Sequence, residues 1–355
     1  MKNLEKYIKT HDLDLKRISR DNAIKERMNS LIPITGLRFG QNTKRFETVP
    51  IRFGEKNDGL CFYIIRTWSH RMGTFELWFE IAFYISYAIK HGYIPYIHMR
   101  DEWNPLRSIN GYSYEGEDRW GRSFRQPQNV YDLDIIGQSQ KVLFNTPNKN
   151  PYWYPFNRMY FEEARRQYHS CYNLIGPNDS VVGMVGQYHI PSNTIGIPIR
   201  REFERGRLIS DVFYTNWHGH RQLGCLDDYV RLAHDLLESG LYDNIFLTCD
   251  DREAVKTFSR EFGSNCIHFD RRLPRFFSDG KPAPANSKDI YVEFDDLDGL
   301  RERFEVIEKE YIAETILMSK CSAIIGTPSA QVLMARVISE DDIPVIDTSI
   351  LLKMF

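Results

Sequence analysis

The amino-acid sequence predicts an α/β protein with two domains, each built around a doubly wound parallel sheet. The first observation is the length of 355 residues, which suits two domains at about 100–200 residues each. The second is that short apolar runs alternate with stretches of helical periodicity, the pattern of parallel strands joined by crossover helices. The third is that this alternation occurs twice and is interrupted over residues 100–180. We therefore expect two domains that face each other across a cleft.

The first half of the chain contains one complete strand–helix–strand unit. Its expected elements, in chain order, are a helix over 1–32 ended by Pro33, a connector with short strands over 33–59, a buried strand over Cys61–Ile65, a helix from Thr74 to about His91 with Gly92 as its C-cap, and a strand over Tyr93–Met99. Two strands joined in this way imply a right-handed parallel crossover. Residues 100–150 are polar and aromatic with many turn residues, and we expect a loop-rich insertion there.

The second half of the chain alternates more regularly. Its expected elements, in chain order, are a helix over Tyr160–Tyr172, a strand over Thr194–Ile199, a helix over Leu226–Ser239 capped by Gly240, a strand over Asn244–Thr248, a helix over Arg252–Phe262 closed by Gly263, a strand over Asn265–His268, a helix over Glu308–Lys320, a strand over Ser322–Ile325, a helix over Ser329–Ile338 and a strand over Pro344–Ile346. This alternation predicts a second parallel sheet with helices on both faces.

Charge and composition narrow the classes of function. Lys and Arg total 46 and Asp and Glu total 48, which gives a formal net charge of −2 at pH 7. This balance removes the bulk electrostatic reason to expect nucleic acid as a partner. Apolar residues make up 42% of the chain and charged residues 26%, as in ordinary globular proteins, so we expect a folded chain.

The cysteines and the apolar runs bear on location. No two of the six cysteines form a CxxC pair, so we expect buried reduced thiols rather than a zinc or redox site. The N-terminal segment is charged and lacks a signal core, and the apolar run Ile81–Ile89 is far shorter than the about 20 residues that span a bilayer. We therefore expect a soluble cytoplasmic protein. The basic, partly apolar start of the chain leaves room for peripheral association with a membrane.

Ligands of open parallel sheets bind beyond the carboxyl ends of the strands, so the residues that follow each predicted strand are candidates. The strand that ends at Ile199 runs into an arginine-rich stretch, Arg200–Arg207. Guanidinium groups there could hold a diphosphate by bidentate hydrogen bonds. The alternative is a solvated charged turn with Arg–Glu pairs.

Two further strand ends carry polar residues. Gly326 and Thr327 precede a predicted helix that Thr327 or Ser329 would cap, and the free N–H groups of such a helix start attract anions. Asp250 and Asp251 follow the strand that starts at Asn244 and could bind a ribose or base, or simply cap the next helix. The chain has no GxGxxG, no GxxxxGK[ST] and no GxSxG motif, so it lacks the dinucleotide, P-loop and serine-hydrolase signatures.

Taken in order, these segments resemble the fucosyltransferase superfamily, which includes α1,6-fucosyltransferases, nodulation fucosyltransferases and protein O-fucosyltransferases. The resembling segments are MGTFELWFEIAFYISYAIKHGYIPYIHM, NPYWYPF, TIGIPIRREFERG, NIFLTCDDREAV and AETILMSKCSAIIGTPSAQVLMARVI. They cover about residues 60–340 in the order of the family. The resemblance implies a GT-B type fold of two Rossmann-like domains. The implied division is an N-terminal helical and connector segment over 1–59, an acceptor-side domain over 60–190 with the insertion at about 100–150, and a nucleotide-sugar domain over 191–355.

The resemblance also implies roles for individual residues. Arg200, with Arg201 beside it, would bind the donor diphosphate, and Asp250 and Asp251 would lie near the nucleotide. Glu314 would bond the guanine edge, because a carboxylate accepts hydrogen bonds from the two adjacent N–H groups of guanine. The alternative for Glu314 is a surface helix residue. The helix-start positions of the family's last motif map to Thr327, Ser329 and Ala330.

Three positions depart from the family pattern. Pro198 replaces a histidine, Phe203 replaces an aspartate, and Ala330 replaces the second serine of the helix-start motif. The proposed diphosphate-binding arginine is retained, whereas an acidic partner of the family is not. These departures bear on the identity of the sugar and on the acceptor more than on the fold.

The implied activity is an inverting transfer of fucose from GDP-fucose to a glycan or glycolipid acceptor, such as a surface polysaccharide. We expect no metal, because arginines could stabilise the leaving GDP in its place. A general base must take the proton of the acceptor hydroxyl, and the candidates are Glu202, Glu204, Asp211, His218 and His220. Two alternatives stay open: a transferase of another nucleotide-activated sugar or group on the same fold, and an inactive transferase-like protein that binds a glycan or a partner.

Overall fold

The computed structural model describes residues 50–66, 74–99, 119–145, 158–199, 201–204, 207–213, 226–249, 252–269, 297–326 and 329–346. Their contacts divide the chain into two compact units. The first unit holds the described residues of 50–145 together with Ser170–Gly176, and the second holds Arg158–His169 and the described residues from Pro177 onward. Helix α6 (Arg158–Ile175) therefore contributes to both units, whereas the sequence predicted a single change of domain near residue 190. The helix expected over 1–32 lies outside the described residues.

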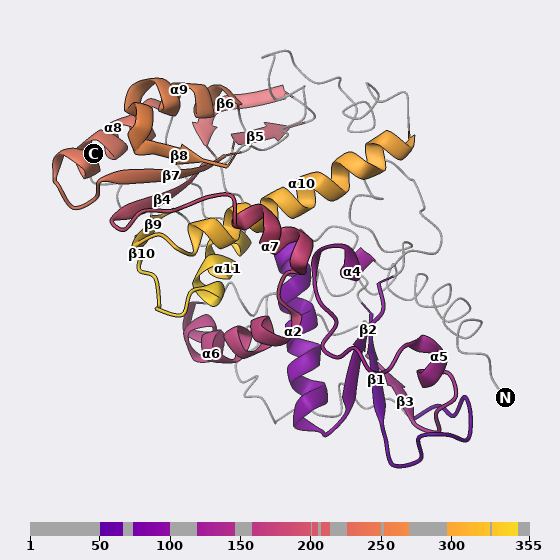
Figure 1. Ribbon diagram of the computed structural model, residues 1–355. Coiled ribbons are helices and arrows are strands. Elements are labelled where there is room, and N and C mark those ends of the chain that lie inside the picture. The colour runs from indigo at the N-terminus through magenta and orange to yellow at the C-terminus, as the bar shows by residue number, and fades with distance from the viewer. Residues whose placement is uncertain are drawn as a thin grey trace. The chain divides into compact units, whose positions relative to one another are not determined.

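The first unit contains a three-stranded parallel sheet (Figure 1). Its strands are β1 (Phe62–Ile65), β2 (Ile94–Ile97) and β3 (Val142–Phe144), in the order β2-β1-β3. Strand β3 lies within the stretch expected to be only a loop-rich insertion. It is three residues long, and its pairing with the central strand β1 is a tertiary contact that no local pattern predicts.

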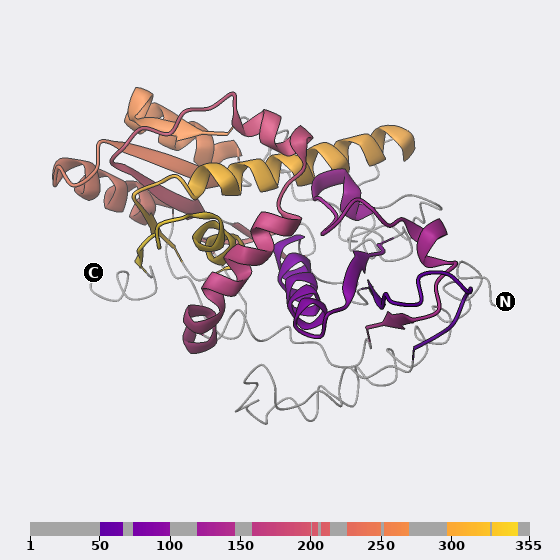
Figure 2. The ribbon, with the colours of Figure 1, turned by 60° about the horizontal axis from the view of Figure 1, so that its bottom comes forward.

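Helix α2 (Thr74–Lys90) packs beside this sheet (Figure 2). It is apolar on nearly all sides, with 13 buried residues, and this composition is typical of a helix inside a core. The helix ends before Gly92, whose φ of 69° is in the left-handed region that a C-capping glycine adopts, as expected. A second cluster on the sheet consists of Phe53, Phe62, Ile64, Ile136, Val142 and Phe144. Two short helices complete the unit, α4 (Arg119–Ser123) and α5 (Leu133–Ile136).

Two side-chain amides hold the strand ends of this unit. Asn145, the residue after β3, accepts a hydrogen bond from the Arg66 backbone N–H at 2.8 Å, and its side-chain amide donates to the Arg66 carbonyl. Gln126 does the same for Ile97 at the end of β2, with distances of 3.1 Å and 2.8 Å. An amide side chain has the donor and acceptor of a peptide group, so each of these side chains pairs with one backbone residue as a neighbouring strand would.

The second unit contains a five-stranded parallel sheet. The strands are β4 (Thr194–Ile199), β7 (Asn244–Cys249), β8 (Cys266–His268), β9 (Ala323–Ile325) and β10 (Val345–Ile346). They lie in the order β10-β9-β4-β7-β8. From β4 the chain adds β7 and β8 on one side of the sheet, and it then adds β9 and β10 on the other side. This is the doubly wound arrangement predicted from the sequence. The direction of building reverses between β4 and β9.

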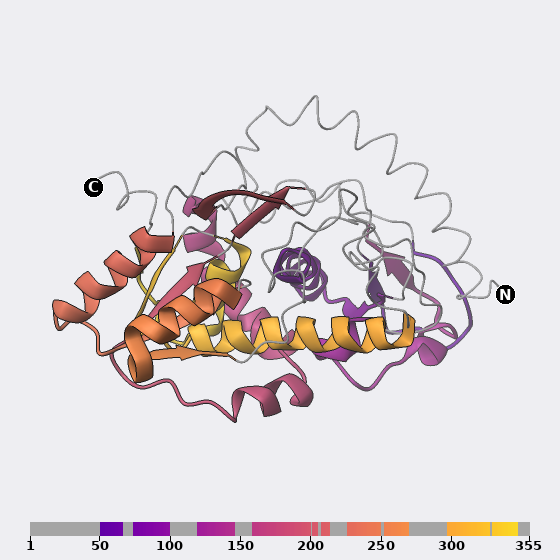
Figure 3. The same ribbon diagram turned by 90° about the horizontal axis from the view of Figure 1, so that it is seen from above.

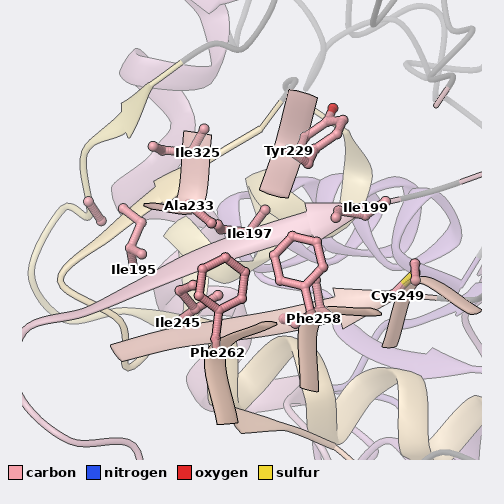
Figure 4. Packing of buried hydrophobic residues seen from close by; sticks show 13 residues of the cluster. Ile195, Ile197, Ile199, Tyr229, Ala233, Ile245, Cys249, Phe258, Phe262 and Ile325 are labelled. Carbon is pink, nitrogen blue, oxygen red and sulfur yellow. The ribbon is translucent and has the colours of Figure 1, made fainter. Parts of the chain in front are cut away.

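Helices cover both faces of this sheet (Figure 1). The covering elements are α8 (Leu226–Glu238), α9 (Arg252–Phe262) with the short 3-10 turn Gly263–Asn265, α10 (Leu297–Met318) and α11 (Ala330–Ile338). Helix α7 (Asp179–Val185) packs against α10. Figure 4 shows the core between the sheet and α8 and α9, where Ile195, Ile197 and Ile199 of β4 meet Tyr229, Phe258 and Phe262. On the opposite face, a Cβ built on Gly196 would lie 3.2 Å from Cγ of Met318, so α10 packs closely there.

Helix α6 joins the second unit through the end of α11. The Arg165 guanidinium donates to the carbonyls of Arg336 and Ser339 at 2.9 Å and 3.2 Å. The His169 ring nitrogen Nδ1 lies 2.7 Å from the Val337 carbonyl. The last carbonyls of a helix have no partner within it, so these contacts satisfy the end of α11.

Two features of the second unit differ from the sequence prediction. The arginine-rich stretch after β4 forms part of an antiparallel hairpin of β5 (Arg201–Glu204) and β6 (Arg207–Phe213), separate from the five strands (Figure 3). Charged residues have low strand propensity, which hid this hairpin. Helix α10 begins at Leu297 rather than near Glu308, because its highly charged first half lacks an apolar face that the sequence would reveal.

Candidate functional site

The candidate site lies at the carboxyl edge of the five-stranded sheet. Strand β4 ends at Ile199 in register with Cys249, the last residue of β7, and β9 ends at Ile325 on the other side of β4. In a doubly wound sheet, the order in which successive strands are added reverses at one point. The loops that follow the two strands at that point run in opposite directions, which opens a crevice for a ligand. The crevice is therefore expected between the carboxyl ends of β4 and β9.

The residues predicted to bind or react divide into three groups. Arg200 follows β4 and Asp250 follows β7 along the chain, but these two, with Asp251, His218, His220 and Thr327, lie outside the described residues. Arg201, Glu202 and Glu204 lie on β5, and Asp211 lies on β6. The described side chains are those of Glu314, Ser329 and Ala330. The structure brings these three together beside β9.

Glu314 is buried, with 2% of its surface exposed, so the alternative of a surface helix residue is wrong. It lies near the end of α10, and its Oε2 accepts a hydrogen bond from Nε2 of Gln331 at 3.5 Å. Side chains of an α-helix tilt toward its N-terminus, and α10 leads back to the start of β9. The Glu314 carboxylate therefore leans toward the carboxyl edge of the sheet, where α11 begins.

The N-terminus of α11 provides backbone donors at the same edge. Ser329 is the N-cap, with φ −86° and ψ 167°, and its hydroxyl accepts from the Val332 N–H at 3.3 Å. The sequence predicted Thr327 or Ser329 as the cap, and the structure shows that it is Ser329, while a role of Ser329 toward a ligand stays a prediction. The positive end of a nine-residue helix that starts at a sheet edge favours an anion.

Pro198 of β4 and Gly326, the residue after β9, are in close contact at the carboxyl edge of the sheet. A Cβ built on Gly326 would lie 2.6 Å from Cγ of Pro198, which is closer than real contacts allow. Gly326 also donates its N–H to the Ile346 carbonyl at 3.0 Å, so its backbone is fixed in the sheet. Pro198 therefore has a packing partner here, and it places an apolar ring where the resembling family has a histidine.

Sequence reasoning missed Gln331, the partner of Glu314. Gln331 is the second residue of α11, a helix whose other described residues are mostly apolar. A single amide in the first turn of an apolar helix was the available signal. It became interpretable only when the structure placed α11 against α10, because the two residues are 17 positions apart.

The described residues contain neither a reactive thiol nor a metal-binding cluster. Cys171, Cys249 and Cys321 are buried as expected, whereas Cys61 and Cys266 are half-buried. Burial raises the pKa of Cys266 to about 12 and also raises the pKa of Cys171, so these thiols stay protonated at neutral pH. Within the described ranges, no three His, Cys, Asp or Glu residues are arranged to hold a metal ion, and no helix is long and apolar enough to cross a membrane.

Comparison with known proteins gives matches to solved structures alone. No family model and no curated protein matches the chain. A structure of NodZ α-1,6-fucosyltransferase soaked with GDP-fucose is 12% identical over 79% of this chain and 93% of its own, with a TM-score of 0.40. A structure of POFUT1 in complex with GDP-fucose is 9% identical over 81% of this chain and 98% of its own, with a TM-score of 0.35. The function proposed below therefore rests on the residues of this chain rather than on these likenesses.

Proposed function

We propose that this protein is a glycosyltransferase that transfers fucose from GDP-fucose to a glycan or glycolipid acceptor. The observation that supports this proposal best is the burial of Glu314 beside the N-terminus of α11, at the edge where the building order of the sheet reverses. A buried acceptor of hydrogen bonds and a set of backbone donors there suit the two ends of a nucleoside diphosphate, the base and the phosphates.

Guanine is the base that fits a carboxylate. It offers the adjacent N1–H and N2–H₂ donors, and Glu314 has two acceptor oxygens, of which Oε2 is held by Gln331. Adenine presents an unprotonated N1 and no N2 amine, so the carboxylate would face a lone pair. Leaving a buried charged acceptor without its donors costs a few kcal/mol, which is about 100-fold or more in affinity.

The transfer itself is proposed to proceed with inversion and without a metal. Negative charge develops on the β-phosphate as GDP leaves, and the N–H groups of α11 together with Arg200 would stabilise it. The general base that removes the acceptor proton is one of Glu202, Glu204, Asp211, His218 and His220. The first three lie on the β5–β6 hairpin that follows β4, so the base and the diphosphate-binding arginine come from neighbouring positions in the chain.

The test is calorimetric titration of the protein with GDP, UDP and CMP, followed by the same titrations of Glu314→Gln. GDP should bind most tightly, and Glu314→Gln should weaken GDP binding about 100-fold, because one acceptor oxygen becomes a donor that opposes a guanine N–H. Glu308→Gln is the matched control, since Glu308 lies on the same helix and is only half-buried. Equal GDP affinity in wild type and Glu314→Gln would overturn the base assignment.

A transferase of another nucleotide-activated sugar is the second candidate. Pro198 favours it, because the apolar ring packed on Gly326 offers no hydrogen bond where the resembling family has a histidine. Preferential binding of UDP or CMP in the same titrations would support this candidate. Binding of none of the three nucleotides would support a protein that has lost transfer and binds a glycan or a partner.

A further inference from the structure

Helix α2 of the first unit contains a buried carboxyl group that no contact explains. Glu80 has 4% of its surface exposed, and within the described part of the chain its Oε2 has no hydrogen-bond partner. The residues next to it along the helix, Phe79 and Ile81, are fully packed apolar side chains. A carboxyl group in such surroundings costs free energy that an apolar side chain of the same size would not cost.

The neighbours of Glu80 connect it to the carboxyl edge of the three-stranded sheet. Tyr84 lies one turn further along α2, and burial together with the nearby Glu80 carboxylate raises the pKa of its hydroxyl. The Asn145 side chain hydrogen-bonds that hydroxyl. Asn145 follows β3 directly and also bonds both backbone groups of Arg66, the residue after β1. Side chains of α2 tilt toward its N-terminus, so the Glu80 carboxyl is directed to this same edge.

The hydrogen-bonding capacity at this edge is unevenly used. The Asn145 amide bonds Arg66 and Tyr84, whereas Oε2 of Glu80 has no hydrogen-bond partner among the residues that the structure describes. Burial raises the pKa of Glu80 to about 8, so at pH 7 the carboxyl is mostly neutral and can both donate and accept a hydrogen bond. A neutral group with both capacities matches a hydroxyl group rather than an ion.

We propose that Glu80 is a ligand-contacting residue that hydrogen-bonds a hydroxyl of the saccharide acceptor at the carboxyl edge of the first sheet. Saccharides present hydroxyls that donate and accept, and the neutral carboxyl group of Glu80 is complementary to them. This assignment rests on the proposed function, because it takes the second substrate of that reaction as its ligand. Glu80 would thus be an acceptor-contacting residue in the first unit, where the sequence analysis named no site residue.

The experiment compares Glu80→Met with Glu80→Gln. The probe is an array of neutral and acidic oligosaccharides incubated with labelled GDP-fucose, and the best wild-type acceptor is then used for kinetics. Glu80→Met keeps the volume but removes the hydrogen bonds, so the acceptor KM should rise about tenfold while GDP binding stays unchanged. Glu80→Gln retains a donor and an acceptor and should restore an acceptor KM near that of the wild type.

Tyr63→Phe is the matched control. Tyr63 lies on β1, and its buried hydroxyl also has no hydrogen-bond partner in the described ranges. Its ring packs near Tyr87 and Tyr93, toward the other end of α2. This variant should leave the acceptor KM unchanged, whereas both Glu80→Met and Tyr63→Phe should raise the melting temperature. Should Glu80→Met not fold, Glu80→Ala provides the same comparison because it removes the carboxyl without adding volume.

Two outcomes would overturn the assignment without touching the nucleotide proposal. One is a folded Glu80→Met or Glu80→Ala variant with the wild-type acceptor KM. The other is a wild-type protein that binds GDP but neither modifies nor binds any oligosaccharide of the array. Absence of GDP binding would instead contradict the proposed function itself, so the two failures are distinguishable.

Discussion

Glu80 and Glu314 are both buried but differ in their surroundings, and the difference has measurable consequences. Glu314 receives a hydrogen bond from Gln331 and lies beside the positive end of α11. Oε2 of Glu80 has no hydrogen-bond partner among the described residues, and burial alone raises the pKa of Glu80 from 4.5 to about 8. A carboxyl group that must be protonated in the folded state makes folding depend on pH.

Glu80→Gln should therefore flatten the dependence of stability on pH. The folded-state pKa of Glu80 lies above the unfolded value, so its contribution is fully present below pH 4.5 and is lost as the pH rises to about 8. At 1.36 kcal/mol for each unit of pKa, the whole loss is about 5 kcal/mol as an upper bound. Urea unfolding at pH 5 and pH 8 measures it: the gain in stability of Glu80→Gln over wild type should be small at pH 5 and several kcal/mol at pH 8.

Tyr63→Phe serves as the control for this measurement. The pKa of Tyr63 is raised further above its usual value of 10 by burial, so its hydroxyl does not ionise between pH 5 and 8. Its effect on stability should be the same at both pH values. A Glu80→Gln gain that does not change between pH 5 and 8 would contradict the ionisation argument.

Single residues were predictable from the sequence where a motif marked them. Glu314 and Ser329 were identified because they belong to segments that resemble a family, and the structure finds the first buried and the second at an N-cap. Glu80 was not identified, because an acidic residue in a helix is usually exposed. Its burial depends on the packing of α2 against β1 and β2, a tertiary contact that the residues around Glu80 do not reveal.

At the scale of secondary-structure elements, the contact of β4 with the end of β9 sets the geometry of the candidate site. Pro198 and Gly326 are about 130 residues apart but are sterically matched. The lack of a side chain at residue 326 is what lets its backbone lie against the Pro198 ring. The pair is therefore suited to a double-mutant test.

Gly326→Ala should destabilise the protein by about 1–3 kcal/mol, because its Cβ would lie 2.6 Å from Cγ of Pro198 and force one strand to shift. Combining it with Pro198→Ala should recover part of that loss, since the smaller side chain vacates the space. Chemical unfolding of the wild type, the two single variants and the double variant gives the coupling free energy. Strictly additive effects would show that the two residues do not share this contact.

Elements were predicted well where local signals were strong. The bounds of β4 and α9 agree with the sequence prediction, because an apolar run or an amphipathic pattern is followed by a clear stop. The three-residue strand β3 and the charged β5–β6 hairpin were missed, because their pairing is set by partners elsewhere rather than by their own composition.

At the scale of the whole molecule, the five-stranded sheet has the doubly wound order that the alternation of strands and helices predicted. That order alone predicts a ligand site at the carboxyl ends of β4 and β9, because the loops that follow these two strands run in opposite directions. The sequence could not predict that α6 is shared between the two units, because a uniform helical pattern continues through the boundary at His169.

The protein should retain its transfer activity in EDTA. The proposed stabilisation of the leaving diphosphate comes from Arg200 and the N–H groups of α11, which a chelator does not remove. Product formation from labelled GDP-fucose, measured with and without EDTA, checks this. A loss of about a thousandfold that Mg²⁺ or Mn²⁺ restores would contradict it and would direct attention to Asp250 and Asp251 as metal ligands.

The amide that Gln126 places on Ile97 also determines how the first sheet meets other polypeptides. Strand β2 is at the edge of its sheet, and residues 95 and 97 alternate with those that bond β1. Pro95 has no N–H, and the Ile97 N–H and carbonyl are both occupied by Gln126. An incoming strand therefore finds no free N–H donor over these positions, so this edge resists the strand addition that begins aggregation, even though β2 is apolar and parallel.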